Sequence, residues 1–388
     1  MIERNESQIT TTQSTINRQP FGPIQRARIQ AALANLFIGD ALSMPVHWFY
    51  NPVDIIRYFP PHGITAMQAA PETHPSSIMH LHSTARGGRG RNPDDESRSI
   101  VGDVILKGKR SFWGRSQVHY HHGLPAGQNT LNAWWARHLI NYLSDNGDYD
   151  RQQWLNHYIA FMTADPAQHP DTYAESCHRG FFANLDAGMD PLNCGAVTHD
   201  TPSMGALVTV APLALALLTS HTLDDTIECC QKHVWSTHPD KLLMNVVKAY
   251  VVLINSLLYR DADEPAEPYL IESSRVIPGA RVDKLLAKNK ADNEVVGQQF
   301  SLACYITDSW PSVCFLAARH GQNAAKALIA NTNLGGENAH RGAVLGSICG
   351  LLSANFDQEL YEQLHEHPVL DADLNRWMER FYHDSGAA

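Results

Sequence analysis

The segment NLGGENAHRGAVLGSICG, residues 333–350, joins a polar cluster to a helical pattern that carries a glycine at every fourth position. These glycines are Gly342, Gly346 and Gly350. Positions four apart lie on one face of an α-helix, and each glycine there costs about 1 kcal/mol relative to alanine. We therefore expect another helix backbone to approach this face closely. The polar residues just before it, Glu337, Asn338 and His340, are expected to face a ligand site at the start of the helix.

Helical periodicity dominates the rest of the chain and predicts an all-α fold. A helix is predicted to begin at Pro23, a residue that a first helical turn tolerates. Further predicted helices cover residues 129–143, 151–164, 173–185, 205–220, 224–238, 240–260, 311–321 and 323–332. Alternating strand patterns are scarce, and no fixed-period repeat is found. The prediction is one compact multi-helix domain over residues 23–388, preceded by a disordered N-terminal tail, residues 1–22, rich in Ser, Thr, Gln and Asn.

Two stretches depart from the helical pattern. Residues 51–128 contain many Pro, Gly and His and are predicted to form long functional loops. Residues 261–300 begin with charged residues and prolines, which predicts a surface excursion.

Charge and cysteine usage restrict the compartment and the partners. The formal net charge is -10 without a long basic run, which argues against nucleic acid as a partner. The seven cysteines are an odd number without a C-x-x-C pair, a pattern typical of reduced thiols in the cytoplasm. The N-terminus has no apolar signal segment, and we find no run of the roughly 18 apolar residues that span a bilayer. We therefore expect a cytoplasmic protein without a membrane partner.

Three segments in this order resemble motifs of the ADP-ribosylglycohydrolase family: GDALSMPVHW (39–48), AGQNTLNAWWARHL (126–139) and LGGENAHRGAVLGSICG (334–350). Weaker matches between them are GALVTVAPLAL (205–215) and STHPDKLLMNVVKAY (236–250). The family consists of compact all-α enzymes that remove ADP-ribose from modified amino acids. The resemblance implies a hydrolase that cleaves an N- or O-glycosidic bond of an ADP-ribosyl or related ribosyl substrate, which is either a small molecule or a protein-linked group.

The same motifs differ from the family at the positions that hold its pair of Mg²⁺ ions. In the family, carboxylates and threonines of the three motifs bind both ions. The corresponding residues here are His47 in the first motif, Gln128, Asn129 and Thr130 in the second, and Glu337, Asn338, Ala339 and His340 in the third. Mg²⁺ prefers hard oxygen ligands and gains little from histidine. The resemblance implies Mg²⁺ as a cofactor, but most of the family's ligands are replaced.

The amide- and histidine-containing motifs resemble one branch of the family, the J-type crystallins and selenoprotein J. The segments that carry this resemblance are VHYHHGLPAGQNTLN (118–132) and GGENAHRGA (335–343). That branch includes lens proteins. An alternative to a hydrolase is therefore a non-catalytic ADP-ribose or nucleotide binder, or a crystallin-like protein, on the same fold.

Glu337 and His340 lie three positions apart, which puts both side chains on one helical face. If the fold of the family holds, His47 faces them. Two histidines and one carboxylate could bind a single softer divalent ion such as Fe²⁺, Mn²⁺ or Zn²⁺. The alternative is a site without metal, in which Glu337 is a first-turn acid and His340 a hydrogen-bonded histidine beside Arg341.

A metal-free glycosidase is a further hypothesis. Glycosidic cleavage needs a carboxylate near the anomeric centre and an acid for the leaving group. The candidate carboxylates are Glu337 and Asp40, although Asp40 could instead fix a turn at the end of its helix. The candidate proton carriers are His47, His340 and His122, because histidine titrates near neutral pH. The candidate substrate-binding residues are Gln128, Asn129, Thr130, Asn338 and His122.

One loop segment is a candidate phosphate site. The segment ARGGRGR, residues 85–91, combines glycines with Arg86, Arg89 and Arg91, which would suit a diphosphate. The alternative is an exposed mobile loop. The next residues include Asp94 and Asp95, which either reach the site or belong to a solvated turn.

Overall fold

The structure, a computed structural model, describes residues 21–90 and 99–382. Its α-helices are α1 (Pro23–Ser43), α2 (Pro52–Tyr58), α3 (Leu131–Asn146), α4 (Arg151–Thr163), α5 (Ser176–Asp186), α6 (Val210–Leu217), α7 (Leu223–Trp235), α8 (Lys241–Tyr259), α9 (Glu267–Ser274), α10 (Val282–Ala287), α11 (Asp292–Val295), α12 (Ile306–His320), α13 (Ala324–Leu334), α14 (Asn338–Ser353), α15 (Gln358–Glu362) and α16 (His367–Phe381). Within the described ranges no strand forms, and β-structure is limited to isolated bridges. The prediction of an all-α fold is confirmed.

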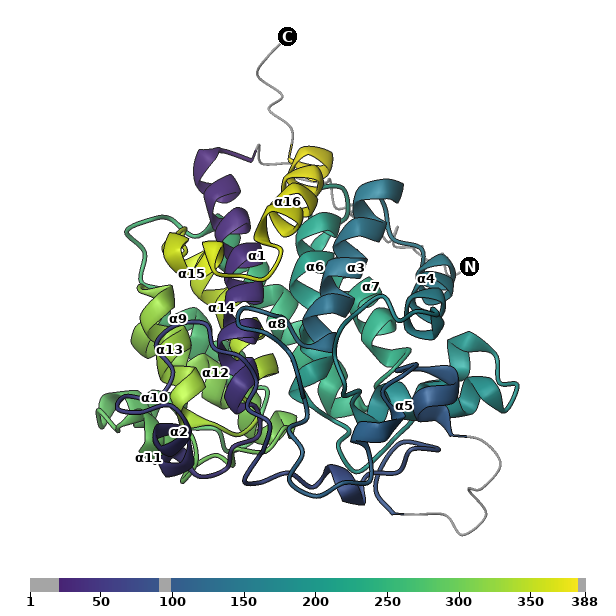
Figure 1. Cartoon of the computed structure of the whole chain (residues 1–388). Coiled ribbons are helices and arrows are strands. Elements are labelled where there is room, and N and C mark those ends of the chain that lie inside the picture. The colour runs from purple at the N-terminus through teal and green to yellow at the C-terminus, as the bar shows by residue number, and fades with distance from the viewer. Residues whose placement is uncertain (1–20, 91–98, 383–388) are drawn as a thin grey trace, which may run out of the picture.

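The centre of the fold is the contact between α1 and α14, the most extensive of all its helix–helix contacts (Figure 1). A Cβ atom added to Gly342 would lie 2.5 Å from the carbonyl oxygen of Gly39 in α1. A Cβ atom added to Gly346 would overlap the backbone of Asn35. The two helix backbones therefore touch with no side chain between them, as the glycine spacing predicts.

The other long helices pack around this pair (Figure 1). Helices α3, α6 and α8 contact α1 and α14 directly or through one another, and α16 lies against α3. Helix α7 covers α6 and α8, while α12 packs against α9, α13 and α14. The buried apolar side chains form one cluster that extends from Ile29 to Tyr382.

Two segments are long and apolar enough to cross a membrane, judged by length and composition alone: Pro23–Val46 and Lys241–Tyr259. This finding corrects our expectation that the chain has no such stretch. The first is 94% buried inside the fold and the second 50%. Both lie among the helices described above, and a mostly buried core helix passes the same test.

Several helices are not predicted by periodicity. Residues 261–300, expected as a surface excursion, contain the short helices α9, α10 and α11. Helix α12 begins at Ile306, so Pro311 lies inside it and does not start it. Helix α16 has one buried face that includes Trp377.

The boundary of the N-terminal tail also differs from the prediction. Phe21 packs its ring edge-on against Tyr382, with 4.7 Å between ring centroids, and Gly22 caps α1. Residues 21 and 22 therefore belong to the folded part. Residues 1–20 lie outside the described residues, as do Arg91, Asp94 and Asp95.

Long loops separate α1 from α3 and run across one end of the helices (Figure 1). They contain α2 and short turns such as η1 (Met44–Val46). These loops carry His47 and His121 to the start of α14.

Candidate active site

Two glycines place Glu337 at the start of α14. Gly335 and Gly336 have φ angles of 73° and 65°, in the left-handed region that glycine adopts readily. A Cβ atom on Gly335 would overlap the carbonyl oxygen of Phe49, and one on Gly336 would overlap that of Leu302. The Glu337 amide donates to the Leu302 carbonyl at 2.8 Å. This turn holds Glu337, the N-cap residue of α14, between loops from distant parts of the sequence.

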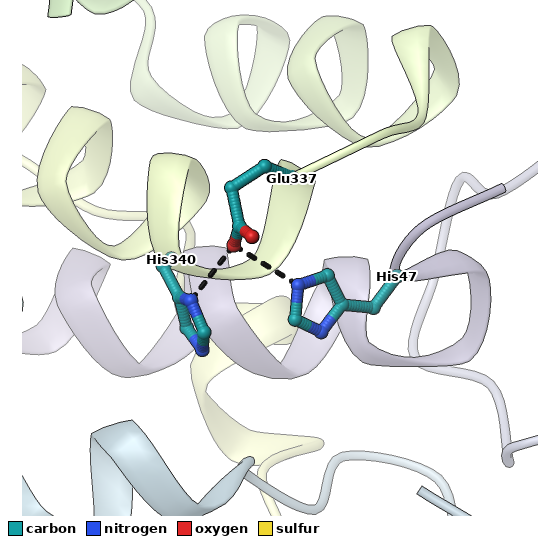
Figure 2. A group of neighbouring side chains, drawn as sticks. All are labelled: His47, Glu337 and His340. Carbon is teal, nitrogen blue, oxygen red and sulfur yellow. Dashed lines mark hydrogen bonds and ion pairs between the residues drawn. The ribbon is translucent and has the colours of Figure 1, made fainter. Parts of the chain in front are cut away.

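Three side chains surround the buried carboxylate of Glu337, and Figure 2 shows two of them, His47 and His340. Its Oε1 lies 2.7 Å from His340 Nδ1 and 3.0 Å from His47 Nε2. Its Oε2 accepts a hydrogen bond of 2.8 Å from the indole nitrogen of Trp48. Both carboxylate oxygens are therefore held by nitrogen atoms, and the helical spacing of Glu337 and His340 brings the two side chains together.

The contacts continue beyond His47 to a second buried carboxylate. His47 Nδ1 lies 2.8 Å from His121 Nε2, and His121 Nδ1 lies 2.9 Å from Asp171 Oδ1. Asp171 Oδ2 also accepts from the Leu131 amide, at 2.7 Å, at the start of α3. Asp171, His121, His47 and Glu337 form an unbroken chain of contacts, which we call the Asp171–Glu337 relay.

The hydrogen bonds of this relay need more protons than two neutral histidines carry. Its three hydrogen bonds need one proton each, but two neutral imidazoles carry only two N–H groups between them. With both carboxylates ionised, the two histidines must therefore share one additional proton. Burial lowers the pKa of His47 to about 3, against the pull of Glu337.

A second acid, Glu175, approaches the same nitrogen of His340. Glu175 Oε1 is 3.7 Å from His340 Nδ1, and Oε2 accepts a hydrogen bond of 2.6 Å from Asn132. A Cβ atom on Gly205 would overlap the Glu175 carboxylate, so the glycine makes room for it. Two buried carboxylates therefore lie near His340 Nδ1.

The environments of these groups shift their pKa values in different directions. Burial alone would lower the pKa of His340, but Glu337 and Glu175 raise it to about 10. Burial alone would raise the pKa of Glu337, but His340 and His47 hold it well below its usual range. Burial raises the pKa of Glu175, and the charge of Glu337 adds to this effect. At neutral pH His340 is charged and Glu337 is ionised, while Glu175 holds a proton more readily than an ordinary glutamate.

Asp40 is hydrogen-bonded to the start of α3, and its charge also contributes to the raised pKa of His340. It is fully buried and accepts hydrogen bonds from the Thr130 amide at 2.7 Å, the Thr130 hydroxyl at 2.6 Å and Asn129 Nδ2 at 2.9 Å. Thr130 is the N-cap residue of α3, so Asp40 ties α1 to the start of α3. No described hydrogen bond or ion pair joins Asp40 to Glu337. These contacts agree with the alternative in which Asp40 fixes a turn at the end of its helix.

The other predicted substrate-binding residues also make contacts of their own. Gln128 contacts His365 at 3.2 Å and accepts from the Trp134 indole at 3.3 Å. Asn338 donates to the Thr332 carbonyl at 2.8 Å, and its Oδ1 is buried without a described partner. His122 packs on Phe112, with 4.9 Å between ring centroids. No described hydrogen bond or ion pair links them to the side chain of Glu337, and their role in substrate binding stays a prediction.

Four residues of the centre are missing from the candidates proposed from sequence: Trp48, His121, Asp171 and Glu175. His121 belongs to the HYHH run, but we chose its neighbour His122, which points to another side of the same turn. Asp171 and Glu175 both precede α5, Glu175 as its N-cap residue, in a segment that matches no motif. Only the tertiary structure brings them to α14.

The donor atoms allow a test of metal binding. His47, Glu337 and His340 each offer a ligand atom, all within 4.8 Å of one another, and Glu175, Cys177 and His178 form a second such group. At the positions where the family holds its two ions, the amide of Asn129 is bonded to Asp40 and that of Gln128 contacts His365. This set does not fit a pair of Mg²⁺ ions, which need several oxygen ligands and retained water. A single borderline cation would fit the first group better.

Comparison with known proteins agrees with the fold and the motifs. A sequence model of the ADP-ribosylglycohydrolase family matches residues 22–387. A solved structure titled "ADP-ribosylglycohydrolase-related protein complex" has a TM-score of 0.57 with 17% identity, covering 92% of this chain and 99% of that chain. A search of curated protein sequences gave no significant match. Since the family match extends over nearly the full sequence, the chain belongs to the ADP-ribosylglycohydrolase family.

Proposed function

We propose that the protein is a hydrolase that cleaves an N- or O-glycosidic bond of an ADP-ribosyl or related ribosyl substrate. Family membership supports a glycohydrolase-type function. The observation that carries the proposal is a pair of buried carboxylates with opposite pKa shifts, Glu337 and Glu175, which both lie near Nδ1 of His340. Pairs of acids whose pKa values are driven apart are the arrangement that acid–base glycosidases use.

The chemistry divides between the two acids. Cleavage of a ribosyl bond develops positive charge on the sugar ring, which an ionised carboxylate stabilises. Glu337 supplies that charge, since His340 and His47 keep it ionised. Glu175 donates a proton to the leaving nitrogen or oxygen as the glycosidic bond breaks. It then takes a proton from the water whose oxygen bonds to the anomeric carbon. The side chain of Glu175 is 7% exposed and that of Glu337 is not exposed.

We also propose that this reaction does not use the family's two Mg²⁺ ions. The residues at the family's positions are amides and histidines, and their contacts differ from those of a hard-cation site. No step above passes through a metal. If a single softer divalent ion binds, its ligands are His47, Glu337 and His340.

A second candidate is a non-catalytic protein of the same fold that binds ADP-ribose or serves a structural role, as the resemblance to the J-type crystallins implies. The observation that favours it is that Glu337 is fully buried with nitrogen partners on both oxygens. A carboxylate with such partners also stabilises the fold of a protein that catalyses no reaction.

The two candidates are separated by an assay of ADP-ribose release. ADP-ribosyl-arginine supplies an N-glycosidic bond and ADP-ribosyl-serine an O-glycosidic bond. We expect Glu337→Gln and Glu175→Gln each to reduce turnover by at least about 100-fold, since general acid–base catalysis contributes roughly that much. Circular dichroism should show a retained helical fold.

The matched control is Glu272→Gln, an exposed glutamate on α9 whose replacement should leave turnover unchanged. Wild-type turnover in the Glu337→Gln or Glu175→Gln protein would contradict the assigned roles. Binding of ADP-ribose by a wild-type protein that hydrolyses neither substrate would instead support the second candidate.

A further inference from the structure

Two buried histidines lie behind the carboxylate centre, and neither takes part in the proposed chemistry. They are His74 and His119, which come from different parts of the loops between α1 and α3, and both are fully buried. An isolated antiparallel bridge between Thr73 and Val118 brings their segments together, and their ring centroids lie 5.1 Å apart. Both side chains are bonded to the main chain around the centre.

His119 uses both of its ring nitrogens for main-chain contacts. Its Nε2 lies 3.0 Å from the carbonyl oxygen of Pro45, and its Nδ1 accepts from the amide of His121 at 3.0 Å. A carbonyl oxygen only accepts and an amide only donates, so Nε2 carries the hydrogen and Nδ1 offers a lone pair. His119 is therefore neutral and in a single tautomer. Burial acts in the same sense, since it lowers the pKa of His119 well below the usual value.

His74 makes the same pair of contacts two residues further along the turn that follows α1. Its Nε2 donates to the carbonyl oxygen of His47 at 2.8 Å, and its Nδ1 accepts from the amide of Ser76 at 3.1 Å. The same argument makes His74 a neutral histidine with its hydrogen on Nε2. The main chain of His47 is thus held by one of the two histidines, and that of Pro45 by the other.

The main chain that follows has an unfavourable conformation. Trp48, directly after His47, has a φ of 64°, in the left-handed region that residues with a side chain rarely adopt. Its amide donates to the carbonyl oxygen of Gly336 at 2.7 Å, and the Val46 carbonyl accepts from Asn338 Nδ2 at 3.4 Å. The segment that carries His47 therefore depends on contacts with other segments for its conformation.

His119 joins the two segments whose side chains meet in the Asp171–Glu337 relay. One nitrogen of its ring is bonded to Pro45, which lies shortly before His47, and the other is bonded to the main chain of His121 itself. The side chains of His47 and His121 lie 2.8 Å apart. One rigid imidazole ring thereby sets the separation of the two main chains from which these side chains extend.

We propose that His119 and His74 are positioning residues for Glu337. His119 sets the distance between the main chains of His121 and His47, and His74 fixes the carbonyl group of His47. Together they keep His47 Nε2 at 3.0 Å from Glu337 Oε1. The catalytic consequence rests on the proposed function, whereas the positioning rests on these contacts alone.

Two variants of His119 each keep one of its contacts. The side-chain oxygen of asparagine can take the place of Nδ1, so His119→Asn keeps the bond from the His121 amide and loses the bond to Pro45. The side-chain nitrogen of glutamine can take the place of Nε2, so His119→Gln keeps the bond to Pro45 and loses the other. Either variant frees one segment from the other.

Nuclear magnetic resonance tests the positioning without a substrate. Two-bond proton–nitrogen correlation spectra distinguish the two ring nitrogens of a histidine, and we expect wild-type His74 and His119 to carry their hydrogen on Nε2 at neutral pH. The ring signals of His47 and His121 should shift in both variants of His119. A wild-type His119 that carries a hydrogen on Nδ1 would overturn the proposal, and so would unshifted signals in both variants.

The matched control is His138→Gln. Nε2 of His138, on α3, also contacts a main-chain carbonyl, that of His157 at 3.2 Å, but this contact lies outside the relay. The ring signals of His47 and His121 should therefore stay in place. Shifts as large as those in the His119 variants would show that loss of any packed histidine disturbs the centre, which would contradict a specific role for His119.

Turnover distinguishes failure of the positioning from failure of the proposed hydrolysis. In an active enzyme, both variants of His119 should lower kcat by about tenfold or more and leave KM within about twofold, because a displaced Glu337 weakens stabilisation of the transition state and not substrate binding. Wild-type kcat in both variants would overturn the positioning role. If the wild type cleaves neither ADP-ribosyl-arginine nor ADP-ribosyl-serine, the proposed function fails, while the shifted signals of His47 and His121 still support the positioning.

Discussion

The geometry around Glu337 depends on the contacts that His121 makes to Asp171 and His47. The contact with His121 overcomes burial to lower the pKa of Asp171. When His121 donates to Nδ1 of His47, His47 presents its Nε2–H to Glu337. Asp171 is therefore a positioning residue, which acts on Glu337 through two histidines.

Replacement of Asp171 by asparagine tests this coupling. An amide lacks the negative charge that favours His121 Nδ1 as a donor to residue 171, so His47 loses its preference for donating to Glu337. We expect the pKa of Glu337 to rise, and the acid limb of the pH–rate profile to move up by about one pH unit. The profile is measured with ADP-ribose release from wild type and Asp171→Asn.

Asp171 also accepts a hydrogen bond from the Leu131 amide at the start of α3. Its replacement therefore also changes the structure there, and this effect has to be distinguished from a change in the pKa of Glu337. The control is Asp150→Ala, which removes the N-cap acceptor of α4 and lies outside the relay. It should lower stability by about 1 kcal/mol and leave the acid limb in place. Equal acid limbs in Asp171→Asn and wild type would contradict the positioning role.

Part of this centre could be predicted from the sequence. Glu337 and His340 follow from helical spacing, and the approach of His47 follows from the resemblance to the family. The choice between His121 and His122 could not be made, because adjacent residues of one turn differ only in direction. Asp171 and Glu175 could not be found either, since their role depends on how α5 and α3 pack against α14.

At the scale of helices, the contact between α1 and α14 sets the position of the site. Asp40 at the end of α1 holds the start of α3, and Glu337 begins α14. A shift of α14 away from α1 would move Glu337 and His340 relative to His47, which follows α1 directly. The glycines at this contact therefore serve the site as well as the fold.

Gly346→Ala should destabilise the protein. The added methyl group would overlap the backbone of Asn35, and overpacking of this kind costs typically about 1–3 kcal/mol. Alanine regains about 1 kcal/mol of helix propensity, which is too little to reverse the sign against an overlap with rigid backbone. Urea unfolding followed by circular dichroism measures the difference.

Gly39 and Gly342 provide an internal control, because each would place its Cβ against the backbone of the other. Once one substitution has separated the helices, the second should cost less. The double variant Gly39→Ala/Gly342→Ala should therefore lose less stability than the sum of the two single variants. A Gly346→Ala protein as stable as the wild type would show that the two backbones do not touch at this point.

The helices could be predicted to different degrees. Those with long apolar periodicity, such as α8 and α14, follow from sequence because burial of one face requires that spacing. The short helices α9 to α11 were missed, since a few residues carry too little periodicity. The loops before α3 were predicted only as loops, and their paths depend on contacts with α5 and α14.

At the scale of the molecule, buried histidines make stability depend on pH. Burial lowers the pKa of His233 and of His238 to about 3, and that of His169 to about 4. These groups are neutral in the folded protein and take up protons on unfolding below about pH 6.5. Stability should therefore fall as pH drops from about 6.5 toward 3. His340 acts in the opposite sense, since its pKa is raised to about 10, and its contribution is lost as pH rises from 6.5 through 10.

His233→Gln should weaken the acid dependence. Each buried neutral histidine adds about 1.4 kcal/mol per pH unit to the loss of stability once pH is below its unfolded value. His233 contacts the hydroxyls of Tyr149 at 2.8 Å and Thr209 at 2.9 Å, and glutamine can keep one of these bonds. Urea unfolding at pH 7, 6 and 5 should give a slope shallower by about that amount in the variant. Identical slopes would contradict a neutral buried His233.

The central claim is that this member of the ADP-ribosylglycohydrolase family cleaves a ribosyl bond with two carboxylates and without paired Mg²⁺ ions. The most direct measurement is ADP-ribose release from ADP-ribosyl-arginine and ADP-ribosyl-serine by the wild-type protein in excess chelator. The account predicts turnover of at least one substrate in chelator and no gain on adding Mg²⁺. Turnover that appears only with Mg²⁺ would contradict it, and so would the absence of turnover under both conditions.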